Sequence, residues 1–239
     1  NSTIQGIAIS SPGAGARDGY IQGWSALPYI HGPKMKEVID TRTHLPAYIE
    51  NDANCAALAE VWNGSAKGKK DVLAVVLGSG IGGAVIKDGY VHKGANLHGG
   101  EFGYMVMDDK QTIWSLLATP YSLVTNVAER KDVDRDSLSG EQIFDLAEQG
   151  DEVCRQEVDK FYYWLAAGIY NLQYMFDPEV ILLGGGISAR EELVDHVNKE
   201  IKKIMDVVEI AKVFPEIRVC KYRQHANLLG AVYGFINER

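Results

Sequence analysis

Two short segments of the chain carry residue types that could do chemistry. In residues 50–54, Glu-Asn-Asp-Ala-Asn, a carboxylate is flanked by two amides directly after a short apolar run at 45–49. In residues 78–83, Gly-Ser-Gly-Ile-Gly-Gly, a glycine-rich turn follows a strongly apolar run. A carboxylate at hydrogen-bond range can take the proton of an attacking hydroxyl, and bare backbone N–H groups suit phosphate oxygens. Together these segments indicate phosphoryl transfer to a polyol.

The composition narrows the class of protein. A chain of 239 residues can form one large domain or two small ones. Its net charge of -8 argues against a general nucleic-acid surface, because phosphate backbones reward clustered Lys and Arg. No uninterrupted apolar stretch reaches transmembrane length, and no signal peptide is evident. We therefore expect neither a nucleic-acid nor a membrane partner.

The cysteines indicate a reducing compartment. Cys55, Cys154 and Cys220 form no CxxC pair, which excludes zinc-ribbon and thioredoxin-like functions. Their odd number and the acidic composition suit the cytoplasm, which is the expected location. Asn1 is not a natural start residue, so part of the natural N-terminus is expected to be missing.

The apolar pattern predicts strands that alternate with helices, which is typical of an α/β chain. Ser139 with Gln142 is expected to form a capping box, and Ser188 to cap a helix reaching Val208. Pro120 is expected to mark a break or a new start in the helical run at 113–130. Strands are expected at 5–10, 45–49, 71–77, 82–87, 180–183 and 217–221, and helices at 33–40, 53–62, 113–130, 139–148, 152–176, 188–208 and 226–237.

In its motifs the chain resembles the ROK family (repressors, open reading frames, sugar kinases) of the actin-like, sugar-kinase and Hsp70 ATPase superfamily. Any one glycine loop would be a weak signal, but five motifs in order are specific. The resemblance covers nearly the whole chain and implies an α/β fold with two actin-like, ribonuclease H-like lobes. The five are the catalytic segment at 50–54, the second phosphate loop at 78–83, the sugar segment at 100–105, the adenosine loop at 180–186 and the connecting helix at 226–231.

The resemblance also implies an organisation and an activity. Residues 1–61 would be the remainder of the small N-terminal lobe, with helix 226–239 crossing back to it, and residues 62–225 the large lobe. The implied activity is ATP- and Mg²⁺-dependent phosphorylation of a hexose or β-glucoside at the 6-hydroxyl. The expected partners are the sugar and ATP. A homodimer is also expected, and the aromatic side chains at 162–176 predict helix packing or a subunit interface.

The resemblance gives individual residues roles, each with a structural alternative. Asp52 would be the general base, although Asp commonly caps a following helix and the two roles are compatible. The phosphate glycines could form an ordinary hairpin turn, and the adenosine glycines a tight strand-to-helix turn. The sugar-binding residues would be Asn51, Glu101, Tyr104 and Ser115, although Asn51 could be a turn amide and Glu101 a solvated loop carboxylate. The nucleotide-binding residues would be Gly78, Ser79, Gly80, Gly82, Gly83, Gly184, Gly185 and Gly186.

Three departures from the family pattern change the expectations. Tyr104 stands where the family has a histidine that serves sugar and zinc, and residues 106–118 contain no cysteine, so no zinc is expected. Ser115 stands where a glutamate usually closes the sugar pocket, which predicts tolerance of an anomeric substituent. Nothing before Gln5 resembles the Asp-x-Gly-Gly-Thr turn that holds the transferred phosphate. The chain is therefore expected to begin partway through the first lobe and to be inactive alone.

Two other functions fit the same motifs. A sugar-sensing transcriptional regulator of the family would carry a helix-turn-helix ahead of residue 1. A non-catalytic sugar-binding protein would keep only the pocket. Asp52 and the acidic net charge favour the kinase. His92 and His98 lack cysteine or carboxylate partners at ligand spacing, so loop positions without a metal are expected for them.

Overall fold

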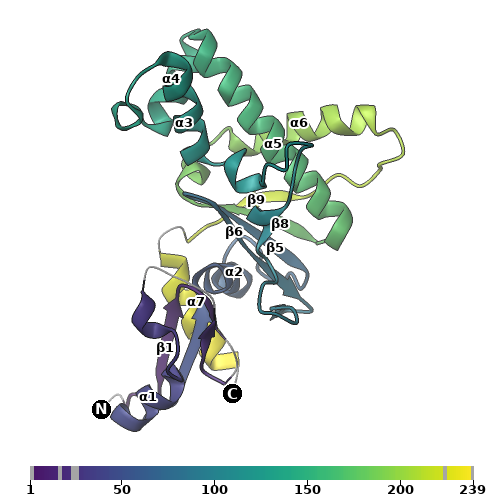
Figure 1. Ribbon diagram of the computed structural model, residues 1–239. Coiled ribbons are helices and arrows are strands. Elements are labelled where there is room, and N and C mark those ends of the chain that lie inside the picture. The colour runs from purple at the N-terminus through teal and green to yellow at the C-terminus, as the bar shows by residue number, and fades with distance from the viewer. Residues whose placement is uncertain (1–2, 16–17, 23–26, 223–224, 238–239) are drawn as a thin grey trace. The chain divides into compact units, whose positions relative to one another are not determined.

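The computed structural model describes residues 3–15, 18–22, 27–222 and 225–237 (Figure 1). The chain forms two compact units. The first comprises residues 1–74, 83–100 and 220–239, and the second comprises 75–82 and 101–219. The lobe boundaries implied by the family resemblance remain a prediction, and their terminal residues 1, 2, 238 and 239 lie outside the described residues.

Two parallel strands form the centre of the first unit. Strand β1 (Ile7–Ser11) pairs with β4 (Ala47–Asn51), and in this register Ile7 lies opposite Ala47 while Ser11 lies opposite Asn51. The carboxyl ends of parallel strands meet at one edge of a sheet. The predicted catalytic segment therefore leaves β4 at the edge where β1 also ends.

Among the described residues, four short elements connect β1 to β4 in the first unit. Strand β2 (Ala14–Gly15) pairs antiparallel with β3 (Ile21–Gln22), followed by η1 (Pro28–Ile30) and α1 (Met35–Thr43). Their apolar side chains join one small core. It consists of buried Ile21, Ile30 and Ile49, with Ile9, Met35 and Ile39 packed against them.

Helices α2 (Asp52–Asn63) and α7 (Ala226–Asn237) pack against each other and against β1 and β4. Glycines in α7 permit this close approach. A Cβ at Gly230 would overlap the backbone of Cys55, and a Cβ at Gly234 would overlap the ring of Tyr48. Because residues four apart share one helix face, these two glycines turn a single smooth surface toward α2 and β4.

A five-stranded sheet has the order β7-β6-β5-β8-β9. Strands β5 and β8 are almost continuously apolar and buried, as expected of strands covered on both faces. Strand β8 pairs in parallel with β9, and β6 pairs antiparallel with β7. The strands are β5 (Val72–Leu77), β6 (Ile81–Lys87), β7 (Tyr90–Val91), β8 (Val180–Gly184) and β9 (Ile217–Val219).

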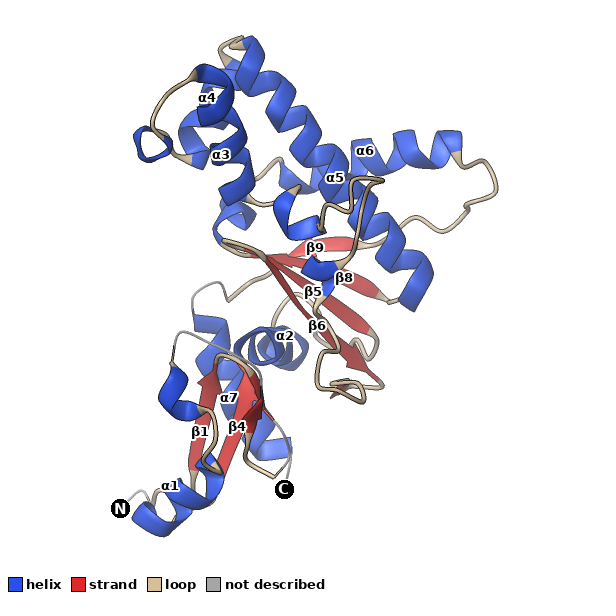
Figure 2. Cartoon of the chain, viewed as in Figure 1, coloured by secondary structure: helices blue, strands red, loops and turns tan. Residues whose placement is uncertain are grey.

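The second unit is mainly helical. Helix α5 packs against α3, α4 and α6, and Figure 2 shows these four helices together. In the described ranges, no helix combines the length and apolarity needed to cross a membrane. The helices are η2 (Phe102–Tyr104), η3 (Trp114–Leu116), α3 (Pro120–Lys131), η4 (Arg135–Ser137), α4 (Gly140–Glu148), α5 (Glu152–Phe176), η5 (Gly186–Ala189) and α6 (Leu193–Val207).

Several local predictions are confirmed. Helices α5 and α7 have the predicted bounds, and Pro120 separates η3 from α3. The capping box of α4 is present, because the Gln142 N–H donates to Ser139 Oγ at 3.2 Å and the Ser139 N–H donates to Gln142 Oε1 at 2.8 Å.

The prediction that Ser188 caps a helix reaching Val208 is wrong. Ser188 lies within η5, and its hydroxyl donates to the Gly185 carbonyl at 2.7 Å. Helix α6 starts only at Leu193, after Glu192, whose side chain makes no capping hydrogen bond. The serine hydroxyl is used by the tight turn after β8, a local bond that competes with helix capping.

Candidate active site

Asn51 is the residue that caps helix α2. Its side-chain Oδ1 accepts the N–H of Ala53 at 2.9 Å and the N–H of Asn54 at 3.2 Å, and its Nδ2 donates to the Gly13 carbonyl at 3.2 Å. The side-chain oxygen of Asn51 is therefore committed to the helix. What the amide still offers to a ligand is its second N–H.

Asp52 is the first residue of α2, and its side chain is exposed. Oδ1 accepts the N–H of Ala53 at 2.8 Å. A carboxylate in the first helical turn is in a favourable place for negative charge. Because Asn51 supplies the cap, the fold does not require Asp52 for that purpose.

A buried carboxylate lies directly behind this pair. Glu50 is only 3% exposed, yet sequence analysis assigned it no role. Its Oε1 accepts the Asn51 N–H at 2.8 Å and Asn54 Nδ2 at 3.0 Å, and its Oε2 lies 2.8 Å from Lys93 Nζ. A charged residue ending a buried strand is a signal that could have found it, since buried charges are nearly always paired.

In the second unit, Ser115 supports the glycine turn. Its Oγ accepts the Ile81 N–H at 2.9 Å, while the Gly78 N–H donates to the Gly80 carbonyl at 2.9 Å. Gly103 packs beneath this contact, because a Cβ there would overlap both Ser115 Oγ and the Ile81 carbonyl. The Ser115 oxygen thus serves the predicted phosphate loop, and a role for Ser115 in sugar binding remains a prediction.

Neither packing nor backbone conformation explains the glycines of this turn. Positive φ is not found at Gly78, Gly80 or Gly82. An added Cβ at Gly78 or Gly80 would meet only ordinary contacts, and at Gly82 no atom of the described residues would lie within 4 Å. The exposed Ser79 lies at the tip of the turn. A bare backbone with open space around it is what a phosphate ligand needs.

The second unit contains a pocket of 580 Å³ beside this turn. Gly78 and Gly186 line it together, so the structure brings one glycine from each predicted nucleotide loop to the same cavity. Gly185 has φ 94°, and a Cβ there would overlap the Leu77 carbonyl, so this glycine is needed for the fold. Gly184 ends the buried strand β8. Apolar lining comes from Leu77, Phe144 and Ile187, and polar lining from Glu141, Asp145 and Arg190.

Glu101 directly precedes the short helix η2, Tyr104 is its last residue, and both side chains are exposed. The Tyr104 N–H donates to the Glu101 carbonyl at 3.3 Å. Between them, buried Phe102 packs edge-on against Phe176 with ring centroids 6.0 Å apart, which anchors the segment to α5. Asn51 and Asp52 belong to the first unit, whereas Glu101, Tyr104 and Ser115 belong to the second.

The described residues form no cluster of potential metal ligands. Nowhere in the described part of the chain do three His, Cys, Asp or Glu side chains gather as a metal site. Mg²⁺ does not require such a cluster, because it usually keeps several waters and binds through one or two carboxylates and the substrate phosphates. The lack of such a cluster among the described residues therefore does not bear on an ion that arrives with a nucleotide.

Comparison with known proteins identifies relatives over the whole chain. The β-glucoside kinase of Listeria monocytogenes is 34% identical over 245 residues, covering 100% of this chain and 81% of that kinase. The crystal structure of a ROK family protein from Streptococcus pneumoniae TIGR4 in complex with sucrose matches with 37% identity and a TM-score of 0.92. The match covers 99% of this chain and 82% of that chain.

A third relative was solved with both kinds of ligand that the motifs suggest. It is the ROK family glucokinase from Streptomyces griseus in complex with glucose and AMPPNP, with 26% identity and a TM-score of 0.74. The match covers 96% of this chain and 80% of that chain. The fold is accordingly that of the actin-like α/β ATPases. Residues 1–238 match the ROK family, and the chain belongs to that family.

Proposed function

We propose that this chain carries the phosphoryl-acceptor machinery of a kinase that phosphorylates a hexose or β-glucoside at the 6-hydroxyl, with Asp52 as general base. The protein is an ATP-dependent sugar kinase, as its ROK family membership and its kinase relatives indicate. The observation that carries the finer proposal is the exposed carboxylate of Asp52 beside a cap supplied by Asn51.

The proposed step forms one bond and breaks another. The sugar hydroxyl oxygen attacks the γ-phosphorus of ATP, the bond from that phosphorus to the β,γ-bridging oxygen breaks, and ADP leaves. Asp52 takes the hydroxyl proton as the new bond develops. Bound Mg²⁺ would neutralise charge on the phosphates. Asn51 would orient the sugar through its remaining N–H.

The nucleotide is assigned to the second unit. The turn at Gly78 and Gly80, together with Gly82 at the start of β6, would hold phosphate oxygens through backbone N–H groups that the turn leaves unbonded. The pocket beside it has the volume range of small-molecule sites, and its lining includes apolar side chains that suit a base. Glu141 and Asp145 also line it and are acceptors suited to ribose hydroxyls. No zinc is expected, because Tyr104 replaces the family histidine.

A β-glucoside is the favoured acceptor. Ser115 is smaller than the glutamate expected from the family pattern, and its oxygen is engaged with Ile81. The smaller side chain would remove a carboxylate acceptor from the expected anomeric end and leave volume there. Glu101 and Tyr104 remain the proposed sugar contacts of the second unit. The Listeria kinase bears the name of a β-glucoside kinase, which supports this choice.

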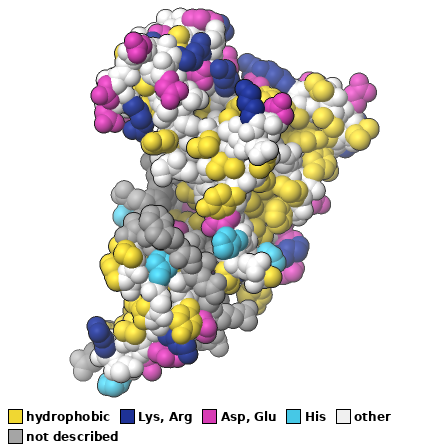
Figure 3. Space-filling view, viewed as in Figure 1, with side chains coloured by type: hydrophobic (Ala, Val, Ile, Leu, Met, Phe, Trp, Pro, Cys, Tyr) yellow, Lys and Arg dark blue, Asp and Glu magenta, His cyan; other side chains and the backbone are white. Residues whose placement is uncertain are grey.

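A homodimer is part of the proposal. Tyr162 is buried, but Tyr163, Tyr174 and Phe176 of α5 are exposed. The Tyr174 hydroxyl accepts the Val213 N–H at 3.0 Å, which brings exposed Val213 and Phe214 beside them. Figure 3 shows hydrophobic side chains gathered over the α5 and α6 part of the second unit. Light scattering of the purified full-length protein would give the oligomeric state.

A coupled assay of ADP release tests the proposed function. The full-length protein would be screened with free hexoses and with β-glucosides, and the product position would be assigned by phosphorus–proton NMR. Sugar-dependent turnover with a 6-phosphorylated product supports the proposal. Sugar binding without any turnover would instead support the sugar-sensing regulator or the non-catalytic sugar-binding protein.

A further inference from the structure

Glu50 makes more contacts than a residue that merely ends a strand. Its two carboxylate oxygens are each contacted by two donor groups. Oε1 accepts from the Asn51 backbone and from the Asn54 side chain, and Oε2 receives Lys93 at 2.8 Å and the Tyr48 hydroxyl at 3.4 Å. All five residues belong to the first unit.

These contacts fix both ends of the segment that bears Asp52. The Asn51 N–H lies one residue before Asp52, and the Asn54 side chain lies two residues after it. The carboxylate of Glu50 therefore binds both the end of β4 and the first turn of α2. Asn54 is itself buried, and its Oδ1 has no hydrogen-bond partner among the described residues, so Glu50 is its principal polar contact.

Lys93 reaches this carboxylate from a distant part of the chain. It follows strand β7 and lies on the segment that leads toward Glu101. Its side chain is 22% exposed, so the ion pair is largely removed from solvent. A pocket of 300 Å³ lined by Tyr48, Glu50 and Lys93 adjoins it. Removing one partner of such a pair leaves an uncompensated buried charge, which is costly.

We infer that Glu50, held by Lys93, is a positioning residue for phosphoryl transfer, which sets the backbone of Asn51 and Asp52 at the angle that the general base needs. The inference rests on the proposed function. Glu50 has no contact with reacting atoms in this account and acts through Asn51 and Asn54. Positioning of this kind matters because a base displaced by about 1 Å can cost roughly 10²-fold in rate.

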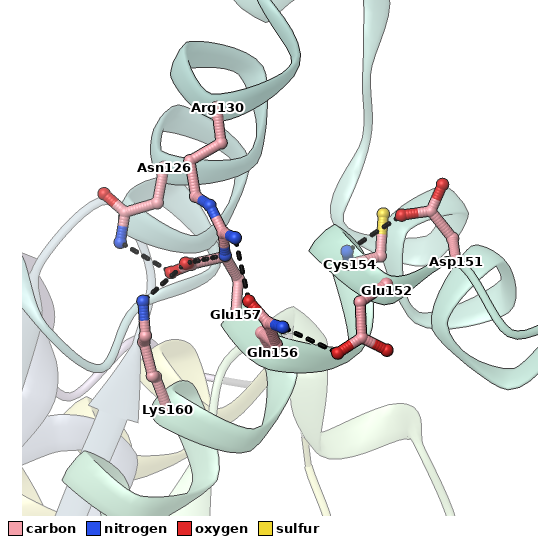
Figure 4. A network of polar contacts seen from close by, with 8 residues as sticks. All are labelled: Asn126, Arg130, Asp151, Glu152, Cys154, Gln156, Glu157 and Lys160. Carbon is pink, nitrogen blue, oxygen red and sulfur yellow. Dashed lines mark hydrogen bonds and ion pairs between the residues drawn. The ribbon is translucent and has the colours of Figure 1, made fainter.

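The chain offers a matched control in the second unit. Glu157 of α5 is also 3% exposed and ion-paired, with Arg130 of α3 and with Lys160, each at 2.7 Å (Figure 4). Asn126 approaches its other oxygen at 3.5 Å. This cluster ties α3 to α5 and carries none of the predicted site residues. Glu50 and Glu157 therefore share burial and pairing but differ in their neighbours.

The test compares K93M, E50Q, the double variant E50Q/K93M and the control E157Q in the full-length protein. Thermal stability, kcat and the KM for sugar are measured for each. We expect K93M to lower kcat by about 10²-fold with a much smaller change in KM, because an unpaired Glu50 carboxylate must shift. The double variant removes both charges and should recover most of kcat, whereas E157Q should lower only the thermal stability.

The outcomes separate the inference from the function on which it rests. A wild-type protein without sugar-dependent turnover defeats the proposed function itself. An active wild type with K93M and E50Q that lose stability as E157Q does, yet keep kcat, overturns only the inference. If K93M does not fold, E50Q and E50Q/K93M are compared. The inference requires a higher kcat in the double variant, and equal values overturn it.

Discussion

The hydroxyl oxygen of Ser115 accepts the backbone N–H of Ile81 at 2.9 Å, which joins η3 to the start of β6, directly after the glycine turn. Ser115→Ala should therefore leave a buried N–H unpaired and loosen the turn. Losing one such bond costs about 1–3 kcal/mol, so the KM for ATP should rise by roughly tenfold. Initial-rate kinetics with ATP and sugar varied separately would check this. A larger rise in the KM for sugar would place Ser115 in the sugar pocket instead.

Two glycine substitutions should separate ligand binding from folding. Gly82→Ala meets open space and no positive φ, so the protein should stay as stable as wild type while nucleotide affinity falls about tenfold or more. Gly185→Ala combines φ 94° with overlap of the Leu77 carbonyl, so its unfolding temperature should fall clearly. Calorimetry and nucleotide titration would measure both. Equal loss of stability in the two variants would argue that the turn at Gly82 is only structural.

The start of α5 should show a specific pH dependence. The Cys154 N–H and then the Lys131 ammonium hold the pKa of Asp151 at about 2, below its ordinary value of 3.8. A carboxyl whose pKa is lower in the folded state stabilises the fold above pH 3.8 and loses that effect as pH falls toward about 2. Asp151→Ala should thus lower the unfolding temperature at pH 7. The gap to wild type should close over that acid range, and a gap unchanged at pH 3 would contradict this.

The protein should accept substituted sugars more readily than a kinase that is strictly specific for glucose. With Ser115 where the family pattern has a glutamate, the anomeric substituent should meet less obstruction, so at least one β-glucoside should have a kcat/KM within about tenfold of that for glucose. A panel of β-glucosides with different aglycones would give the ratios. A strong preference for free glucose over every glycoside would contradict the altered pocket.

How far the sequence predicts this molecule depends on whether the signal is local. Helix α5 follows from its apolar period and from Pro178 beyond its end, and the capping box of α4 follows from Ser139 and Gln142. Family motifs predicted both nucleotide loops, and Gly78 and Gly186 line one pocket of the structure. Such features depend on neighbours a few residues apart.

Contacts between distant segments could not be predicted in the same way. Ser188 is bonded to Gly185 rather than to a helix, because the turn after β8 takes its hydroxyl. Glu50 meets Lys93 only through the tertiary fold. Likewise, the cap of α2 is Asn51 and not Asp52. This choice depends on a backbone angle that either residue could adopt.

The central claim is that Asp52 takes the proton of the acceptor hydroxyl. Asp52→Asn in the full-length protein keeps the shape and hydrogen-bonding capacity of the side chain but removes its basicity. The direct measurement is sugar-dependent ADP release by this variant, together with its sugar affinity from calorimetric titration. We predict a fall in kcat of at least about 10²-fold with sugar affinity retained. Turnover near that of the wild type would contradict the account and leave Asp52 as an ordinary residue of the first turn of α2.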